Sequence, residues 1–128
     1  MPMMAEMLVR LAEIAGASAA DAAEVGRTQG RAEARRYGTA PSCLEALVAE
    51  MDRIGFDPAV GEGDEDDSAV VAFAHCPFRA LAESHPDLVC SLHRGLVEGF
   101  VDAMGDASVG EFCTLAHRTP CQVALVAR

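Results

Sequence analysis

Apolar residues recur at three- and four-residue intervals in the first 55 positions of the chain, and this spacing predicts three amphipathic helices. Ser18 and Ser42 stand where the second and third helices would begin, and a serine hydroxyl commonly caps the free N–H groups of a first helical turn. Gly16 and Gly55 follow the first and third apolar stretches and are expected to end those helices. The three predicted helices cover residues 4–15, 19–36 and 43–54.

Beyond Gly55 the pattern changes to short apolar runs around one long helical stretch. Pro86 suits the first position of that long helix, Gly105 is expected to end it, and a shorter helix at 79–85 precedes it. The predicted order is three helices, a hairpin, two helices and a second hairpin, which indicates an α+β domain with helices packed on an antiparallel sheet built from the two hairpins. The four strands are expected at residues 56–60, 69–75, 107–115 and 121–127.

Length and charge narrow the class of protein. The chain has 128 residues, of which 51% are hydrophobic, so we expect residues 1–128 to form a single domain with its own core. No run of 18 apolar residues occurs, which argues against a membrane span, and the N-terminus lacks the basic start of a secretory signal. Twenty acidic residues against ten basic ones give a net charge of −10, so we do not expect the chain to bind DNA by itself.

Five cysteines and four histidines are the chemically most informative residues. Without a secretory signal, cysteines indicate a reducing, cytoplasmic setting, where thiols serve as core residues, redox centres or metal ligands. Cys90 and His93 are three positions apart on one face of the long helix, and Cys76 follows a predicted strand.

Two further cysteines flank the last predicted turn. Cys113 and Cys121 are symmetric about His117, so a hairpin that turns there would place them opposite each other across the ladder. Thiolates and imidazoles together suit zinc or an iron–sulfur cluster. The expected metal ligands are Cys76, Cys90, His93 and Cys121, with Cys113 as the alternate. The other histidines of the loops, His85 and His117, are expected to be exposed.

An alternative prediction makes the cysteines ordinary core residues and assigns the chain a small-molecule pocket between the long helix and the sheet. We do not expect an enzyme, because no third orienting residue and no glycine-lined oxyanion motif accompany the cysteine and histidine residues. The predicted lining of that pocket is Phe73, Phe78, Leu92, Leu96 and Phe100.

Four glycines occupy helical positions that glycine disfavours. Gly26 and Gly30 fall in the second predicted helix, and Gly95 and Gly99 fall in the long one. Each costs about 1 kcal/mol relative to alanine, so we expect a compensating close approach of another helix.

Residues 75–100, HCPFRALAESHPDLVCSLHRGLVEGF, carry a resemblance to a known family. The pattern Cys76-Pro77-Phe78, His85-Pro86, Leu88-Val89-Cys90, His93, Gly95 and Gly99 resembles the C-terminal half of ArsR/DeoR-like winged helix-turn-helix regulators, including relatives of the iron–sulfur-responsive SufR-type repressors. The resemblance implies that Cys76 and Cys90 are cluster ligands, joined by Cys113 or Cys121. The order of elements is also similar to that of sensor domains of the 4-vinyl reductase type.

The resemblance implies an effector and dimerisation domain of a transcriptional regulator. The winged helix-turn-helix of the family has no counterpart in this sequence, so DNA contact is expected only through an N-terminal domain outside it. A homodimer is expected, and the first predicted helix offers a surface for it because it is rich in methionine. Those methionines are Met1, Met3, Met4 and Met7.

Overall fold

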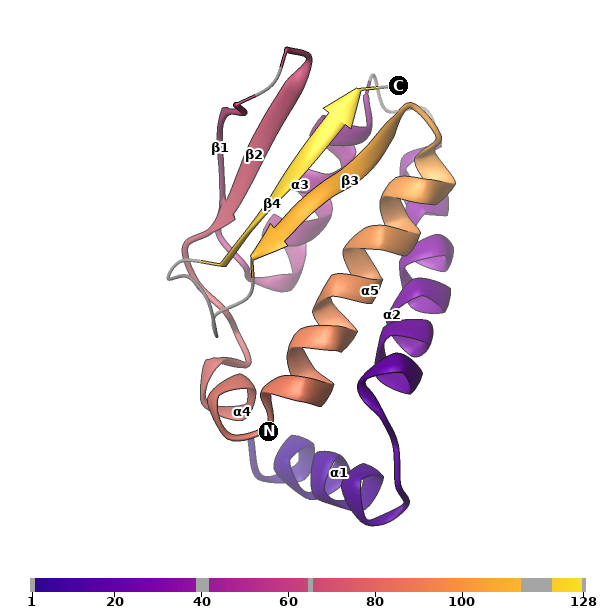
Figure 1. Ribbon diagram of the computed structural model, residues 1–128, viewed down its shortest axis with the longest axis vertical. Helices are drawn as coiled ribbons and strands as arrows, with labels where there is room; N and C mark the ends of the chain where they lie inside the picture. Colours follow the sequence, from indigo (N-terminus) through magenta and orange to yellow (C-terminus); the bar gives the residue numbers. More distant parts are fainter. Residues whose placement is uncertain (1, 39–41, 65, 114–120, 128) are drawn as a thin grey trace.

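An antiparallel sheet with helices on one face makes up the fold (Figure 1). The structure, a computed structural model, describes residues 2–38, 42–64, 66–113 and 121–127, and the turn predicted around His117 lies outside this part. The order of elements confirms the α+β prediction. The elements are α1 (Pro2–Ile14), α2 (Ala19–Ala34), the 3-10 turn η1 (Arg35–Tyr37), α3 (Cys43–Ile54), β1 (Pro58–Glu62), β2 (Ser68–Phe73), α4 (Arg79–Ser84), α5 (Pro86–Met104), β3 (Ala107–Cys113) and β4 (Cys121–Ala127).

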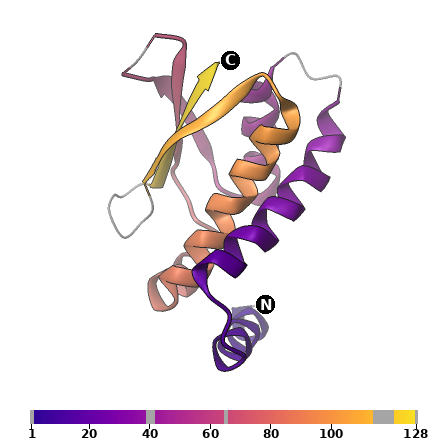
Figure 2. The same cartoon turned by 45° about the vertical axis from the view of Figure 1, so that its right-hand side comes forward.

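The two hairpins join into one sheet with the strand order β1-β2-β4-β3. Figure 2 shows the sheet on one side of the molecule and the helices α2 and α5 on the other. Alternate residues of the central strands are buried, as expected for a sheet that is covered on one face. These inward residues are Val71, Phe73, Val123 and Leu125.

The ladder of the second hairpin shifts by one residue between Val109 and Phe112. Beyond this shift Cys113 pairs with Gln122 and not with Cys121. The prediction that the two cysteines face each other was therefore wrong, because one irregularity in the strand changes every later pair.

Local signals set the helix ends. The Ser18 hydroxyl accepts a hydrogen bond from the backbone N–H of Asp21, whose carboxylate accepts one from the backbone N–H of Ser18. At the end of α3 Gly55 has a φ of +98°, and the backbone N–H of Phe56 donates to the Met51 carbonyl at 2.9 Å. Phe56 thus completes the helix cap, which is why β1 begins at Pro58, two residues later than predicted.

The helices α2 and α5 pack through their glycines, which confirms the expected close approach. A Cβ on Gly30 would lie 2.7 Å from the Phe100 backbone nitrogen, and one on Gly99 would lie 2.7 Å from the Arg27 Cα. Gly26 and Gly95 meet the opposite backbone in the same way. The two backbones are so close that no side chain fits between them.

Helix α1 crosses the ends of α2, α4 and α5 at the base of the molecule (Figure 1). His85, predicted as an exposed loop residue, holds it there with a side chain that is only 13% exposed. Its Nε2 lies 2.9 Å from Glu6 Oε1 and its Nδ1 lies 2.8 Å from Glu13 Oε1. The prediction failed because both carboxylates belong to a helix that is distant in sequence.

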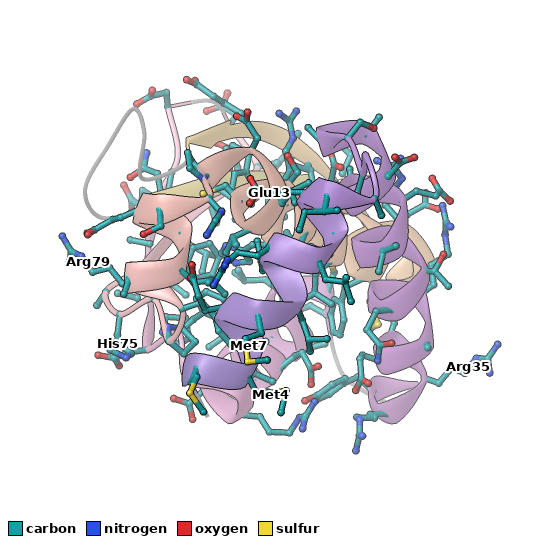
Figure 3. All side chains as sticks on the ribbon, turned by 90° about the horizontal axis from the view of Figure 1, so that it is seen from below. Met4, Met7, Glu13, Arg35, His75 and Arg79 are labelled. Atoms are coloured by element: carbon teal, nitrogen blue, oxygen red, sulfur yellow. The ribbon has the colours of Figure 1, made fainter. Side chains whose placement is uncertain are left out.

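The outer face of α1 is apolar and exposed, and Figure 3 shows Met4 and Met7 along this helix as seen from its side of the molecule. The exposed fractions of its large side chains lie between 51% and 83%. We call this set the α1 outer face; it consists of Met3, Met4, Met7, Leu8, Leu11 and Ile14. None of the helices in the described ranges is both long and apolar enough to cross a bilayer.

Candidate functional site

A cavity of about 430 Å³ lies between the helices and one end of the sheet. Helix α1 supplies one wall, α2 and α5 supply a second, and the sheet and the segment around α4 close the rest. The described residues that line it are Ala5, Leu8, Val9, Val25, Gly26, Gln29, Ile54, Phe56, Phe73, Cys76, Phe78, Leu81, Ala82, Val89, Cys90, Leu92, His93, Leu96, Phe112 and Cys121.

The lining of this cavity carries no charged side chain among the residues just named. Its polar groups are the Gln29 amide, the His93 imidazole and the thiols of three cysteines, and the remaining surface is apolar. Such a surface favours an apolar occupant, because a charged one would lose its hydration without gaining a counter-ion.

His93 is held by aromatic rings on three sides. Phe56 stacks on its face with ring centroids 4.1 Å apart, while Phe73 and Phe112 make edge contacts at 4.8 and 5.4 Å. Burial lowers the pKa of His93 to about 4, so the ring is neutral at physiological pH. Its Nε2 is buried and has no hydrogen-bond partner within the described part of the chain.

Three of the four thiols in the predicted ligand set line this same cavity. Cys76 comes from the segment after β2, Cys90 from α5 beside His93, and Cys121 from the start of β4. Burial raises the pKa of the Cys76 thiol. The side chain of Cys113 lies outside the described residues, although its backbone belongs to β3.

The donor types of Cys76, Cys90, His93 and Cys121 therefore converge on one cavity, as the sequence predicted. Among the described residues, no three histidine, cysteine, aspartate or glutamate side chains are placed to hold one ion. The thiols and the imidazole suit zinc or an iron–sulfur cluster in chemistry, but the donors that the structure describes are not arranged around one ion, and we derive no mechanism through a metal.

The predicted small-molecule pocket agrees with the cavity at four of its five positions. Phe73, Phe78, Leu92 and Leu96 line it. Phe100 is not among the described lining residues, because it points into the core, is fully buried and contacts the edge of Tyr37.

Sequence reasoning missed the contribution of α1 and of two aromatic residues. Ala5 and Val9 of α1 line the cavity, as do Phe56 and Phe112. The sequence did contain an indication of the role of α1, because apolar residues surround most of the circumference of this helix. Such a helix contacts apolar surface on more than one side.

The arginines of α2 do not form a free basic patch. Arg27 lies 2.8 Å from Glu24 and 3.4 Å from Glu98, and Arg31 lies 3.9 Å from Asp102. Each of these two guanidinium groups therefore lies beside a carboxylate that offsets its charge.

Comparisons with known proteins give no family for this chain. No family model matches it, and no curated protein is significantly similar to it.

Proposed function

We propose that this chain is a sensor module that binds a small, mostly apolar molecule in the cavity beside α5. The observation that carries the proposal is an apolar cavity of about 430 Å³ whose lining includes His93, and Nε2 of that imidazole is buried without a hydrogen-bond partner among the described residues. Ligand sites in proteins are concave and mostly apolar, with a few polar groups that orient the ligand, and their volumes run from about 300 to 1,000 Å³.

The position of α1 supports a sensing role. One side of α1 lines the cavity through Ala5 and Val9, while its outer face is exposed, and Leu8 at the edge of that face also lines the cavity. A molecule in the cavity contacts α1 directly and would favour the α1 position that it fits best. A ligand shifts a conformational equilibrium by the difference in its affinity for the two states.

We further propose that the sensor is a cytoplasmic homodimer in a transcriptional regulator and acts on DNA only through a separate DNA-binding domain. Its partner surface is the α1 outer face, whose six large apolar residues are each more than half exposed. A contiguous apolar surface of this kind is typical of a protein–protein interface. Cys43 and Cys76 are free thiols, as is usual for cysteines in a reducing compartment.

A second candidate function is supported by the thiols. Cys76, Cys90, Cys121 and His93 come from separate parts of the sequence and line one cavity. A zinc or iron–sulfur sensor would need these groups to move closer together when the ion binds.

The test compares an uncharged solvatochromic dye with a metal assay. We expect Nile red to bind the purified protein with a blue-shifted emission. Val25→Trp, which fills the mouth of the cavity from an exposed position, should weaken binding at least tenfold. Val60→Trp is the matched control, because Val60 is also exposed but belongs to β1 and does not line this cavity.

Equal dye binding by the Val25 and Val60 variants would contradict the cavity proposal. Protein purified without oxygen is analysed for zinc, iron and sulfide in parallel. About one ion or cluster per chain, lost in Cys90→Ser, would favour the second candidate, and absence of both metal and dye binding would overturn both functions.

A further inference from the structure

We infer that the ligand of this cavity is an uncharged hydrophobic molecule with one hydroxyl-type group that hydrogen-bonds to Nε2 of His93. The inference rests on the proposed function and specifies its ligand class. It stands on three features of the described residues: the unpartnered nitrogen, the rings that fix it and the lack of charge in the lining.

The first step is the missing partner of His93. Buried polar side-chain atoms nearly always have a hydrogen-bond partner, and leaving one without a partner is unfavourable. Nε2 of His93 is the only buried side-chain nitrogen or oxygen without a partner among the described residues. A bound molecule that supplies this hydrogen bond would remove the penalty, so the site discriminates in favour of such a molecule.

The second step is the fixed direction of the ring. The contacts with Phe56, Phe73 and Phe112 cover one face and the edges of the imidazole, and these phenyl rings have no nitrogen or oxygen to hydrogen-bond to it. His93 is also part of the cavity wall, so a molecule in the cavity lies against this residue and is the candidate partner for its buried Nε2. Aromatic packing keeps the ring from turning away to find another partner.

The third step concerns the chemical type of the group. A neutral imidazole carries a proton on one nitrogen only, so Nε2 either donates or accepts. A hydroxyl group can accept in the first case and donate in the second. It therefore fits both tautomers, whereas an ether or a ketone fits only one of them.

The last step excludes ions. The described lining holds no lysine, arginine, aspartate or glutamate, so neither an anion nor a cation finds a counter-charge in the cavity. Burying an unpaired charge costs far more free energy than a single hydrogen bond returns. The ligand is therefore uncharged, and its size is limited by the cavity volume of about 430 Å³.

Three compounds of nearly equal shape test the inference: 2-naphthol, 2-methylnaphthalene and 2-naphthoate. We expect 2-naphthol to bind about tenfold more tightly than 2-methylnaphthalene, and 2-naphthoate to bind most weakly, in titrations followed by calorimetry. In His93→Phe the preference for the hydroxyl should disappear while 2-methylnaphthalene still binds. His75→Phe, at an exposed position outside the lining, should keep the preference.

A spectroscopic measurement on the unaltered protein covers the case in which His93→Phe does not fold. The ¹⁵N chemical shift of His93 Nε2 should move when 2-naphthol is added and stay close to its free value with 2-methylnaphthalene. Equal affinities for these two compounds, or tightest binding of 2-naphthoate, would overturn the ligand class and leave the cavity function intact. Failure of 2-methylnaphthalene and of Nile red to bind would overturn the proposed function itself.

Discussion

Two histidines of this chain occupy opposite electrostatic environments. His93 is enclosed by aromatic rings, and burial lowers its pKa to about 4. The side chain of His85 lies between the carboxylates of Glu6 and Glu13, and its hydrogen bonds to them raise its pKa above the usual 6.5. Only the imidazolium has a proton on each nitrogen, so both of these contacts are hydrogen bonds only when His85 is charged.

The two environments predict opposite effects of pH on stability. A lowered pKa in the folded state means that the unfolded chain binds the proton more tightly. The contribution of neutral His93 to the free energy of unfolding is therefore present above pH 6.5 and is lost on acidification. Between pH 8 and pH 5 this loss should be about 2 kcal/mol. Urea unfolding across this range should therefore show a flatter profile for His93→Phe than for the original chain.

His85 should act in the other direction. Because its pKa is raised in the folded state, the contribution of His85 to the free energy of unfolding is fully present below pH 6.5. This contribution is lost as the pH rises through the pKa of His85 in the folded protein. His85→Gln should therefore destabilise the protein at pH 6 and have less effect at pH 9, in the same unfolding series. Parallel profiles for the two variants and the original chain would show that neither histidine is linked to folding in this way.

At the scale of elements, the closest contact in the fold is that between α2 and α5. Gly30→Ala and Gly99→Ala each place a methyl group against backbone atoms of the opposite helix, so the helices must separate. We expect a loss of about 2 kcal/mol or more in the free energy of unfolding, despite the better helix propensity of alanine.

Gly38→Ala is the matched control for the glycine variants. Its φ is −56°, and the nearest atom to an added Cβ is the Arg35 carbonyl oxygen at 3.9 Å. This variant should be neutral or up to about 1 kcal/mol more stable, because alanine restricts the unfolded chain. If Gly38→Ala lowered the free energy of unfolding as much as Gly30→Ala or Gly99→Ala does, the close contact between α2 and α5 would not be the cause of the loss. Thermal and urea unfolding measure all three.

The boundaries of these elements could be predicted where the controlling interactions are local. The cap at Ser18, Pro86 at the start of α5 and Gly105 at its end act within one helical turn, and the sequence predicts each of them correctly. The start of β1 was misplaced because Phe56 combines a role in the α3 cap with an aromatic contact to His93. Hydrophobic pattern alone cannot assign such a residue to one element.

At the scale of the whole molecule, the site residues were predicted correctly where residue type determines burial. They were missed where elements that are distant in sequence meet. Cys76, Cys90 and His93 were correctly expected to gather in one place, since only the short helix α4 separates β2 from α5 along the chain. The residues of α5 that line the cavity were predicted only in part. Both Leu96 and Phe100 are apolar, and only the tertiary packing decides which of them lines the cavity.

The orientation of α1 depends on the whole molecule as well. Its narrower side, with Ala5 and Val9, turns inward, and its larger apolar side chains turn outward. His85 fixes this orientation through carboxylates that lie near the inward side. A helix whose larger apolar face is left exposed typically contacts another surface, and an isologous dimer would let two α1 helices cover each other.

This arrangement predicts that a charge on the α1 outer face dissociates the dimer. Leu11→Glu should weaken self-association at least 100-fold, because the carboxylate would be buried without a partner at the centre of the interface. Val60→Glu, at a position on β1 that is also more than half exposed, should leave the dimer intact. Light scattering coupled to size exclusion measures both, and an original chain that is monomeric at high micromolar concentration would exclude the interface. Since α1 also lines the cavity, ligand binding and dimerisation are expected to be linked. A cavity ligand that raises the affinity of self-association must bind the dimer more tightly than the monomer by the same factor.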